Sequence, residues 1–344
     1  MSSDLLEIDG SFGEGGGQIL RTSLALSLLS GRPFRLYNIR AGRSKPGLQP
    51  QHLTSVQAAA AIGRAKLRGA SRGSSDLTFE PGQVMAGNYR FDIGTAGATS
   101  LVLHTIYLPL ALCGGAPSHL TLVGGTHVSH SPCFHFLDTT WRHYLDLLGL
   151  RVSLRMVRPG FYPRGGGLVE ATIQPAARLH PLHLRERGPV RLSGFSAVAG
   201  LPEDIARRQA RRARFRLEQH DLKANIREES WEGGPGTVLA IVVHTTPAPV
   251  LCFGLGVRGK PAERVADEAV DQVLAYVRAA PAAVHAHSAD QLVLPLALAE
   301  GPSEFTVAEV TRHLTTNIEV VRLFLGRDVQ CEGEEGSPGV VRIK

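Results

Sequence analysis

Residues 13–21, GEGGGQILR, combine residue types that bind phosphate. The three consecutive glycines have no side chains, so the backbone there can approach a ligand closely and adopt a positive φ. Glu14 could hold a divalent metal ion and Arg21 could bind phosphate oxygens, with Gln18 between them. Apolar residues with helical spacing follow from Ile19. The segment therefore fits a phosphate site at a helix N-terminus, or else a flexible turn before a core helix.

Residues 39–48 form a second segment suited to phosphate, because Arg40, Arg43 and Lys45 lie within six positions. Glycine and proline interrupt the segment, which is more typical of a phosphate-binding loop than of a solvated helix face. Gln51 and His52 then open an alanine-rich helix. An ordinary solvated charged loop is the alternative interpretation.

A histidine near the C-terminus, His313, follows a strand-like run at 304–308. Thr316 and Glu319 have the spacing of a capping box, which predicts a helix that begins at Thr316. His313 would then lie on an exposed elbow before that helix. A neutral imidazole in this position can attack phosphorus, although a lone histidine in a turn is more often a surface residue.

Four motifs occur in a fixed order along the chain: EGGGQILR, IRAGRSKPGLQPQH, RPGFYPRGGG at 158–167 and RHLTTN at 312–317. Each motif alone is weak evidence. Together, over about residues 8–326, they resemble the RNA 3′-terminal phosphate cyclase family. The order and the spacing make this resemblance specific.

The resemblance implies an α/β (α+β) fold. Its large domain would hold three repeated units, each with two helices on a four-stranded sheet, and a smaller α/β domain would be inserted before the last unit. The expected division is 1–182 with 281–344 for the large domain and 183–280 for the insert. The chain alternates helical and strand-like segments accordingly, with helices expected near 18–30, 52–68, 98–113, 134–149, 203–219, 262–279, 288–299 and 316–326.

The resemblance also implies a reaction with ATP and an RNA that ends in a 3′-phosphate. His313 would form a covalent histidyl-AMP, the AMP would move to the RNA 3′-phosphate, and the neighbouring 2′-hydroxyl would close a 2′,3′-cyclic phosphate. Glu14 would bind Mg²⁺ or Mn²⁺.

The residues expected to bind the nucleotide and its phosphates are Gln18, Arg21, Arg40, Arg43, Gln51, His52, His104, Pro132, His287, Asp290 and Gln291. Two of these depart from the family pattern. Family members often have glutamine at the position of His104, and bacterial relatives often have, at the position of His287, a tyrosine that stacks on adenine. Asn317 would either form a hydrogen bond nearby or cap the helix. The three glycines at 165–167 are expected to serve a tight turn.

Two further clusters have alternative readings. The helix expected at 203–217 carries six arginines, which fit either RNA contact or a solvated face. A zinc site is one interpretation of the cluster His127, His130, Cys133 and His135. Ligands this close in sequence rarely complete a tetrahedral site alone, however. The resemblance places this GGT-x₅-P loop near the nucleotide instead.

Composition fits a two-domain enzyme. The 344 residues are 43% hydrophobic, with a formal net charge of +6, which is compatible with a polyanionic partner. The chain has no apolar run of 18 residues, which a membrane span would need, and residues 1–4 lack the features of a signal peptide. The four cysteines are widely spaced, as is usual for reduced thiols. A cytoplasmic location is therefore expected.

Two other functions fit some of these features. A non-catalytic cyclase-like protein could bind RNA as a ribosome-assembly factor, but such relatives lack the histidine that stands here at 313. A simple RNA-binding module would bind RNA without using ATP.

Overall fold

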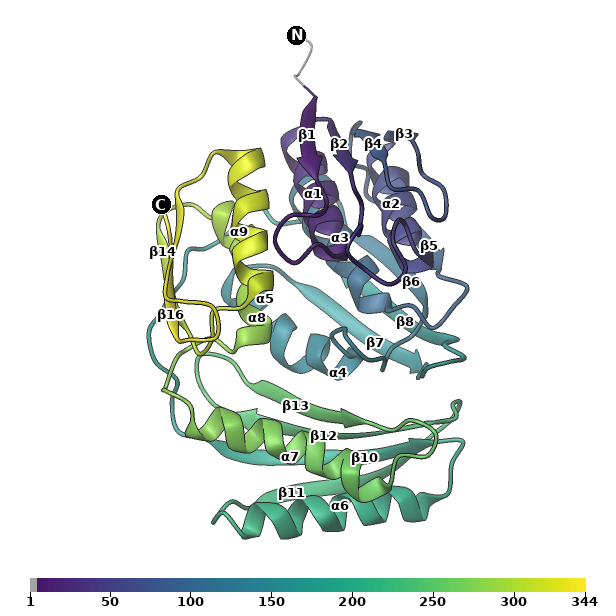
Figure 1. Ribbon diagram of the computed structural model, residues 1–344, viewed down its shortest axis with the longest axis vertical. Helices are drawn as coiled ribbons and strands as arrows, with labels where there is room; N and C mark the ends of the chain where they lie inside the picture. Colours follow the sequence, from purple (N-terminus) through teal and green to yellow (C-terminus); the bar gives the residue numbers. More distant parts are fainter. Residues whose placement is uncertain (1–4) are drawn as a thin grey trace.

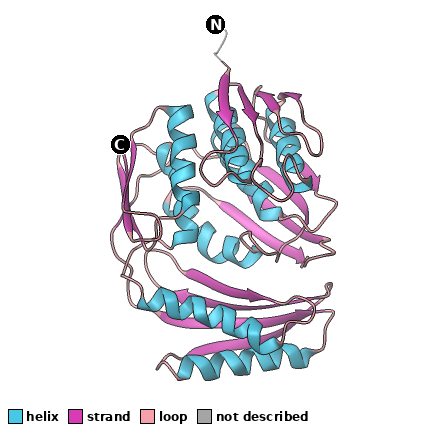
Figure 2. Ribbon diagram, viewed as in Figure 1, coloured by secondary structure: helices cyan, strands magenta, loops and turns pink. Residues whose placement is uncertain are grey.

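The computed structural model describes residues 5–344 and contains four four-stranded sheets, each with helices packed against it (Figures 1 and 2). Residues 1–4, on which the expectation about a signal peptide rests, lie outside the described residues. Within residues 5–344, no helix has both the length and the apolar character needed to cross a membrane.

The first sheet belongs to a β-α-β-α-β-β unit. Its strands are β1 (Leu6–Asp9), β2 (Phe34–Tyr37), β3 (Lys66–Arg68) and β4 (Leu77–Glu80), and its helices are α1 (Gly17–Ser30) and α2 (Pro50–Gly63). The sheet order is β1-β2-β4-β3, with β1 and β2 parallel and the other pairs antiparallel.

The second unit repeats this arrangement, with the sheet order β5-β6-β8-β7. Its strands are β5 (Asn88–Asp92), β6 (Ser118–Gly124), β7 (Val152–Arg158) and β8 (Gly167–Ile173). Its first helix is α3 (Thr99–Cys113). The second is one continuous helical segment made of α4 (Phe134–Phe136), the π-helical η1 (Leu137–Trp141) and α5 (Arg142–Leu147).

The third unit has the same order again, β9-β14-β16-β15. Its strands are β9 (His183–Leu184), β14 (Ser303–Val307), β15 (Val329–Glu332) and β16 (Gly339–Ile343), and its helices are α8 (Ala286–Ala297) and α9 (Arg312–Leu325). The three repeated units expected from the resemblance are therefore confirmed.

The fourth sheet interrupts the third unit between β9 and α8, and its order, β11-β10-β12-β13, differs from that of the repeats. It contains β10 (Arg191–Ala199), β11 (Ala224–Trp231), β12 (Gly236–His244) and β13 (Val250–Leu255), covered by α6 (Glu203–Glu218) and α7 (Ala262–Arg278). Its apolar residues form a core of their own. β9 pairs with β14, so the first two residues of the span 183–280 contribute to the third repeat.

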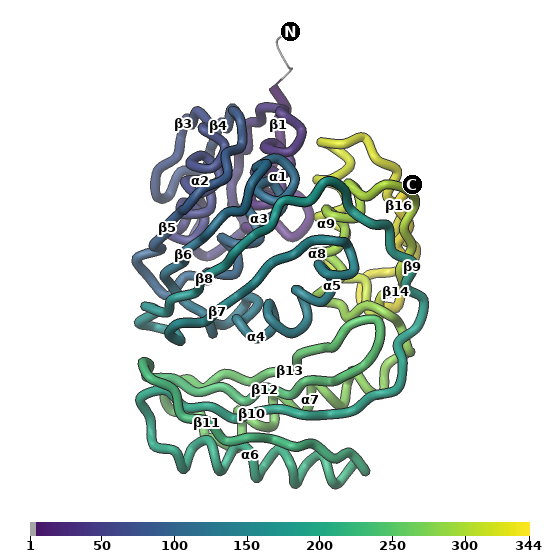
Figure 3. The backbone as a smooth tube through the Cα atoms, turned by 180° about the vertical axis from the view of Figure 1, so that it is seen from behind, coloured from purple at the N-terminus to yellow at the C-terminus, as the bar shows by residue number. Residues whose placement is uncertain are grey.

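The helices of the three repeats meet one another, and their sheets lie outside. α1 packs against both α3 and α9, and α9 also packs against α8. Seen from behind, β5–β8 form the outer face over these helices (Figure 3). This packing places the N-termini of α1 and α9 side by side, although 295 residues separate Gln18 from His313.

Two helix predictions are wrong at one end. α2 stops at Gly63 rather than near 68, because Arg64 takes a left-handed φ of 46° and caps the helix, after which residues 66–68 form β3. α9 begins at Arg312, four residues earlier than predicted.

Candidate functional site

His313 lies in the first turn of α9, which begins earlier than the capping-box pattern indicates. The N-cap is Thr311, whose hydroxyl accepts a hydrogen bond from the Leu314 N–H at 3.2 Å. Thr316 lies inside the helix instead, where its Oγ1 accepts from the backbone N–H of Glu14 at 2.9 Å. The predicted cap is therefore a contact between α9 and the glycine-rich segment, while the expectation of His313 at a helix N-terminus holds.

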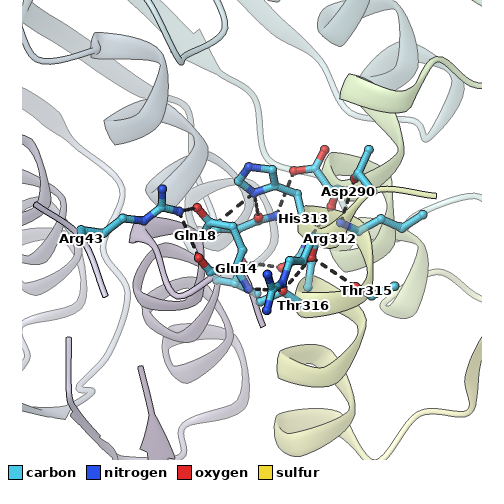
Figure 4. A network of polar contacts seen from close by, with 12 residues as sticks. Glu14, Gln18, Arg43, Asp290, Arg312, His313, Thr315 and Thr316 are labelled. Carbon is cyan, nitrogen blue, oxygen red and sulfur yellow. Dashed lines mark hydrogen bonds and ion pairs between the residues drawn. The ribbon is translucent and has the colours of Figure 1, made fainter. Parts of the chain in front are cut away.

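Gln18 connects His313 to Asp290 (Figure 4). The Gln18 Oε1 lies 2.6 Å from His313 Nδ1, and the Gln18 Nε2 donates to Asp290 Oδ2 at 2.9 Å. Since the amide nitrogen is directed to the carboxylate, the amide oxygen faces the imidazole. His313 Nδ1 must then carry a proton and donate it to Gln18, which leaves the lone pair on Nε2.

Burial and charge set the protonation states along this chain. Partial burial lowers the pKa of His313, and the charges of Arg21 and Arg43 lower it further, so the imidazole is neutral at neutral pH. Burial raises the pKa of Asp290 to about 7, against the opposing effects of backbone hydrogen bonds, Gln18 and Arg21. Burial also lowers the pKa of Arg21 to about 10. Because this pKa is still well above 7, the guanidinium stays charged at neutral pH.

Asn317 fixes the same region from α9 rather than capping the helix. Its Nδ2 donates to the Asp290 carbonyl at 2.5 Å, and its Oδ1 accepts from the Thr22 hydroxyl at 2.6 Å. Of its two expected roles, hydrogen bonding is confirmed.

Glu14 lies at the edge of the His313 site. Its Oε2 is 4.0 Å from His313 Nδ1, and its Oε1 forms an ion pair with Arg43. Arg43 also donates to the Glu14 carbonyl at 3.0 Å. The Oε2 atom is buried and has no hydrogen-bond partner among the described residues. One carboxylate oxygen is thus free for a ligand.

The second basic segment packs beside the glycine-rich one. A Cβ on Gly17 would lie 2.5 Å from His52 Nε2 and 2.7 Å from Arg21 Nη1, so these two side chains could not keep their positions if residue 17 were larger than glycine. Burial lowers the pKa of His52 to about 3, and Arg21 and Arg40 add to this effect, so His52 is neutral. Arg40 instead donates to backbone carbonyls of its own loop, including Gly47 O at 3.2 Å.

A cavity of about 740 Å³ opens beside His313 and extends to β13 and α7. Eight of the predicted residues line it: Gln18, Arg21, His104, Pro132, His287, Asp290, Gln291 and His313. The other five, Glu14, Arg40, Arg43, Gln51 and His52, are absent from its walls and lie around the α1 and α2 N-termini.

Two of these wall residues have unpartnered buried atoms. The Nε2 of His104 and the Oε1 of Gln291 have no hydrogen-bond partner among residues 5–344. Burial lowers the pKa of His104 to about 3, so its ring is neutral, and Trp141 packs 5.1 Å from it. His287 also has a lowered pKa, through burial and the nearby His313, with Glu309 opposing the shift.

The sequence interpretation missed other walls of the cavity. Tyr107 and Trp141 come from the helices of the second repeat, while Phe253 comes from β13, Lys260 from the loop that follows it and Gln272 from α7. The aromatic residues were visible as apolar positions of predicted helices. Nothing in the local sequence near Lys260 indicates a binding site.

Comparison with known proteins agrees with this geometry. The model of the family described as RNA 3′-terminal phosphate cyclase matches residues 12–331. The chain belongs to the RNA 3′-terminal phosphate cyclase family.

Relatives named RNA 3′-terminal phosphate cyclase cover almost the whole chain. The protein from Caldivirga maquilingensis is 46% identical over 95% of this chain and 94% of its own length. The protein from Ralstonia nicotianae is also 46% identical, over 98% and 96%, and that from Thermococcus onnurineus is 44% identical, over 98% and 99%.

In this cyclase family member, three of the six α6 arginines pair with acidic residues of α7. Arg208 pairs with Glu263 at 2.8 Å, Arg212 pairs with Asp267 at 2.8 Å, and Arg216 pairs with both Asp267 and Asp271. These arginines recur every four residues and therefore share the helix face toward α7. The α6–α7 contact thus accounts for half of the six arginines.

The histidines considered for zinc instead join the repeats to the β10–β13 segment. His127 Nε2 lies 2.9 Å from His135 Nδ1, and His135 stacks on Trp231 with ring centroids 5.4 Å apart. Among residues 5–344, no three His, Cys, Asp or Glu side chains group as metal ligands would. His130 and Pro132, both in the GGT-x₅-P loop, lie in the cavity wall.

Proposed function

We propose that this protein converts an RNA 3′-terminal phosphate to a 2′,3′-cyclic phosphodiester, using ATP and a covalent histidyl-AMP on His313. The observation that carries the proposal is the hydrogen-bonded series Asp290–Gln18–His313 at the mouth of the cavity. A neutral imidazole whose Nδ1 proton is held by an amide oxygen presents Nε2 as a nucleophile.

In the first step, His313 Nε2 attacks the α-phosphorus of ATP. The Nε2–P bond forms, the bond from phosphorus to the oxygen bridging the β-phosphate breaks, and pyrophosphate leaves. The imidazole becomes positively charged as the bond forms. The hydrogen bond from Nδ1–H to Gln18 Oε1 is stronger when the imidazole is charged, which stabilises the transition state. Asp290 holds Gln18 in place by accepting a hydrogen bond from its Nε2.

In the second step, an oxygen of the RNA 3′-phosphate attacks the adenylate phosphorus and releases His313. In the third step, the 2′-hydroxyl oxygen attacks the terminal RNA phosphorus, loses its proton, and expels AMP as the ring closes. Activation is required because oxide is a poor leaving group from a phosphate, whereas AMP leaves readily. Positioning and charge neutralisation supply most of the catalysis.

Cations and neutral donors around the α1 and α2 N-termini suit the phosphates. We assign Arg21, Arg40 and Arg43 to phosphate oxygens of ATP and of the RNA end, with Gln51 and His52 beside them. We assign the nucleoside to the cavity walls. His287 and Pro132 would contact the base. The unpartnered Nε2 of His104 would donate or accept a hydrogen bond, and the Oε1 of Gln291 would accept one.

Glu14 fits a divalent cation. Its unpartnered, buried Oε2 is an oxygen ligand of the kind that Mg²⁺ and Mn²⁺ prefer, and phosphate oxygens and water would complete the coordination. When bound there, the cation would neutralise charge on the nucleotide phosphates. Arg43, paired with the other Glu14 oxygen, orients the carboxylate.

We further propose that residues 1–182 and 281–344 form the catalytic domain and 183–280 the insert, apart from the β9 residues that join the third repeat. The separate core and the different strand order of β10–β13 support this division. The insert contributes Phe253, Lys260 and Gln272 to the cavity.

The test is incubation with ATP labelled at the α-phosphate, with Mg²⁺ or Mn²⁺, followed by a denaturing gel at alkaline pH. We expect wild type and the control His220→Ala, an exposed histidine on the insert, to carry label, and His313→Ala to lose it by more than about 10³-fold. Equal labelling of His313→Ala would contradict the proposal.

A further inference from the structure

The turn between β7 and β8 presents an aromatic side chain to solvent. Tyr162 is 72% exposed, whereas the other exposed large hydrophobic residues of the described chain reach at most 53%. Arg158 and Arg164 flank it, and within residues 5–344 neither forms an ion pair with an acidic side chain. Exposed aromatic residues interspersed with free cations are typical of surfaces that bind single-stranded nucleic acid.

This turn is held in place by its own contacts. Phe161, next to Tyr162, is buried, and its ring stacks on His127 with centroids 5.2 Å apart. The Gly165 N–H donates to the Phe161 carbonyl at 2.7 Å, and Arg158 Nε donates to the Gly166 carbonyl at 2.9 Å. Tyr162 therefore projects from a fixed turn.

A surface of small residues connects the turn to the phosphate site. Gly165 has a φ of 65°, and a Cβ on it would lie 2.7 Å from the Ala96 Cα, so the turn packs against residues 94–97. At the other end of that segment, the Ala98 N–H donates to Gln51 Oε1 at 3.1 Å. The 94–97 segment and the turn lie at the same end of the β5–β8 sheet (Figure 1).

The 94–97 segment carries no acidic side chain that would repel a polyanion. The nearest acidic group along the segment is Asp92, whose Oδ1 accepts from the Gly94 N–H at 2.8 Å. Residues 94–97, GTAG, have side chains no larger than threonine, so a chain lying over them meets few obstructions.

We propose that the single-stranded RNA upstream of the 3′-phosphate lies along the Tyr162 surface, defined as Gln51, residues 94–97, Tyr162 and Arg164. One base stacks on the Tyr162 ring, and Arg164 contacts the backbone phosphates. The inference rests on the proposed function, because the RNA end is placed at the phosphate site. It identifies the substrate as an RNA with several unpaired nucleotides before its 3′-phosphate.

The test compares a single-stranded oligonucleotide 3′-phosphate with a nucleoside 3′-phosphate, which has no upstream nucleotide to place on the Tyr162 surface. For the oligonucleotide, we expect Tyr162→Ala to raise the KM of cyclisation, and the Kd from fluorescence anisotropy, by about 10-fold. Arg164→Ala should weaken binding less and reduce its salt dependence. Tyr162→Phe should behave as wild type, since the ring remains.

Three controls make the result specific. Phe215→Ala removes another exposed aromatic ring, on α6, and should change neither constant. Histidyl-AMP formation by Tyr162→Ala should equal that of wild type, which also shows that the variant folds. Cyclisation of the nucleoside 3′-phosphate should be unchanged.

An unchanged Kd of the oligonucleotide for both Tyr162→Ala and Arg164→Ala would overturn the inference, as would equal weakening of the nucleoside 3′-phosphate. If wild type forms no histidyl-AMP, the proposed function fails, but the anisotropy comparison still decides whether Tyr162 binds RNA.

Discussion

The α6 helix and the loops around His313 are both rich in arginine, but their arginines have different partners. On α6, Arg208, Arg212 and Arg216 pair with acids of α7. Around His313, Arg43 pairs with Glu14, whereas Arg21 and Arg40 form no ion pair within residues 5–344. The number of cations in a segment therefore does not locate the phosphate site. What matters is whether acidic side chains from distant segments already pair with those cations.

The largest difference between the two regions is expected for a buried glutamine in each. Gln18→Leu removes the acceptor of the His313 Nδ1 proton, so we expect histidyl-AMP formation to slow by about 10²-fold. Gln209→Leu is the matched change in the insert, where Gln209 bonds Ser196 and Thr237. It should lower stability by about 2 kcal/mol without slowing adenylation by folded protein. Single-turnover labelling and chemical denaturation measure the two effects.

A carboxylate in each region gives the next contrast. Glu14→Gln weakens the oxygen site for a divalent cation, so we expect about 10-fold more Mg²⁺ or Mn²⁺ to be needed for half-maximal adenylation. Glu263→Gln, which loses only the partner of Arg208, should leave the metal dependence unchanged. A metal titration in which both variants match wild type would contradict the assignment of Glu14.

The pH dependence separates two aspartates. Because burial raises the pKa of Asp290 to about 7, its carboxylate becomes ionised as pH rises through 7 and then supports Gln18 more strongly. We expect adenylation to rise several-fold between about pH 6 and pH 8. Asp290→Asn should flatten this part of the profile, whereas Asp267→Asn should retain it. A flat wild-type profile would show that Asp290 does not act through its charge.

The smallest effect is expected for the α6 arginines. Arg212 is 37% exposed, and its pair with Asp267 is partly screened by solvent, so Arg212→Ala should lower the unfolding free energy by about 1 kcal/mol. RNA affinity and cyclisation should stay unchanged. A clear loss of RNA affinity in Arg212→Ala would reverse the comparison between the two regions.

Much of the fold and the site could be predicted from the sequence, because the signals were motifs with fixed spacing. The glycine-rich segment at a helix start, the basic loop and His313 each carried a chemical reason for phosphate binding. The structure places Gln18 against both His313 and Asp290, as expected for residues of one site.

The remaining features depend on contacts between distant segments. Asp267, which pairs with Arg212, is 55 residues away, and no local pattern links them. Thr316 fits a capping box by spacing, yet its hydroxyl bonds Glu14, which lies 302 residues earlier. Lys260, in the loop between β13 and α7, reaches the cavity because β13 packs against α4 and η1 of the second repeat. Tertiary packing decided each of these cases over local sequence preference.

The most direct measurement is mass spectrometry of the protein after reaction with ATP, digested with trypsin at alkaline pH to preserve a phosphoramidate. Cleavage after Arg312 and Arg322 yields the peptide that spans residues 313–322 and contains a single histidine. The account predicts AMP on this peptide, attached to His313 and absent from His313→Ala. AMP on a different peptide, or cyclisation of RNA with no protein-bound AMP at any time point, would contradict it.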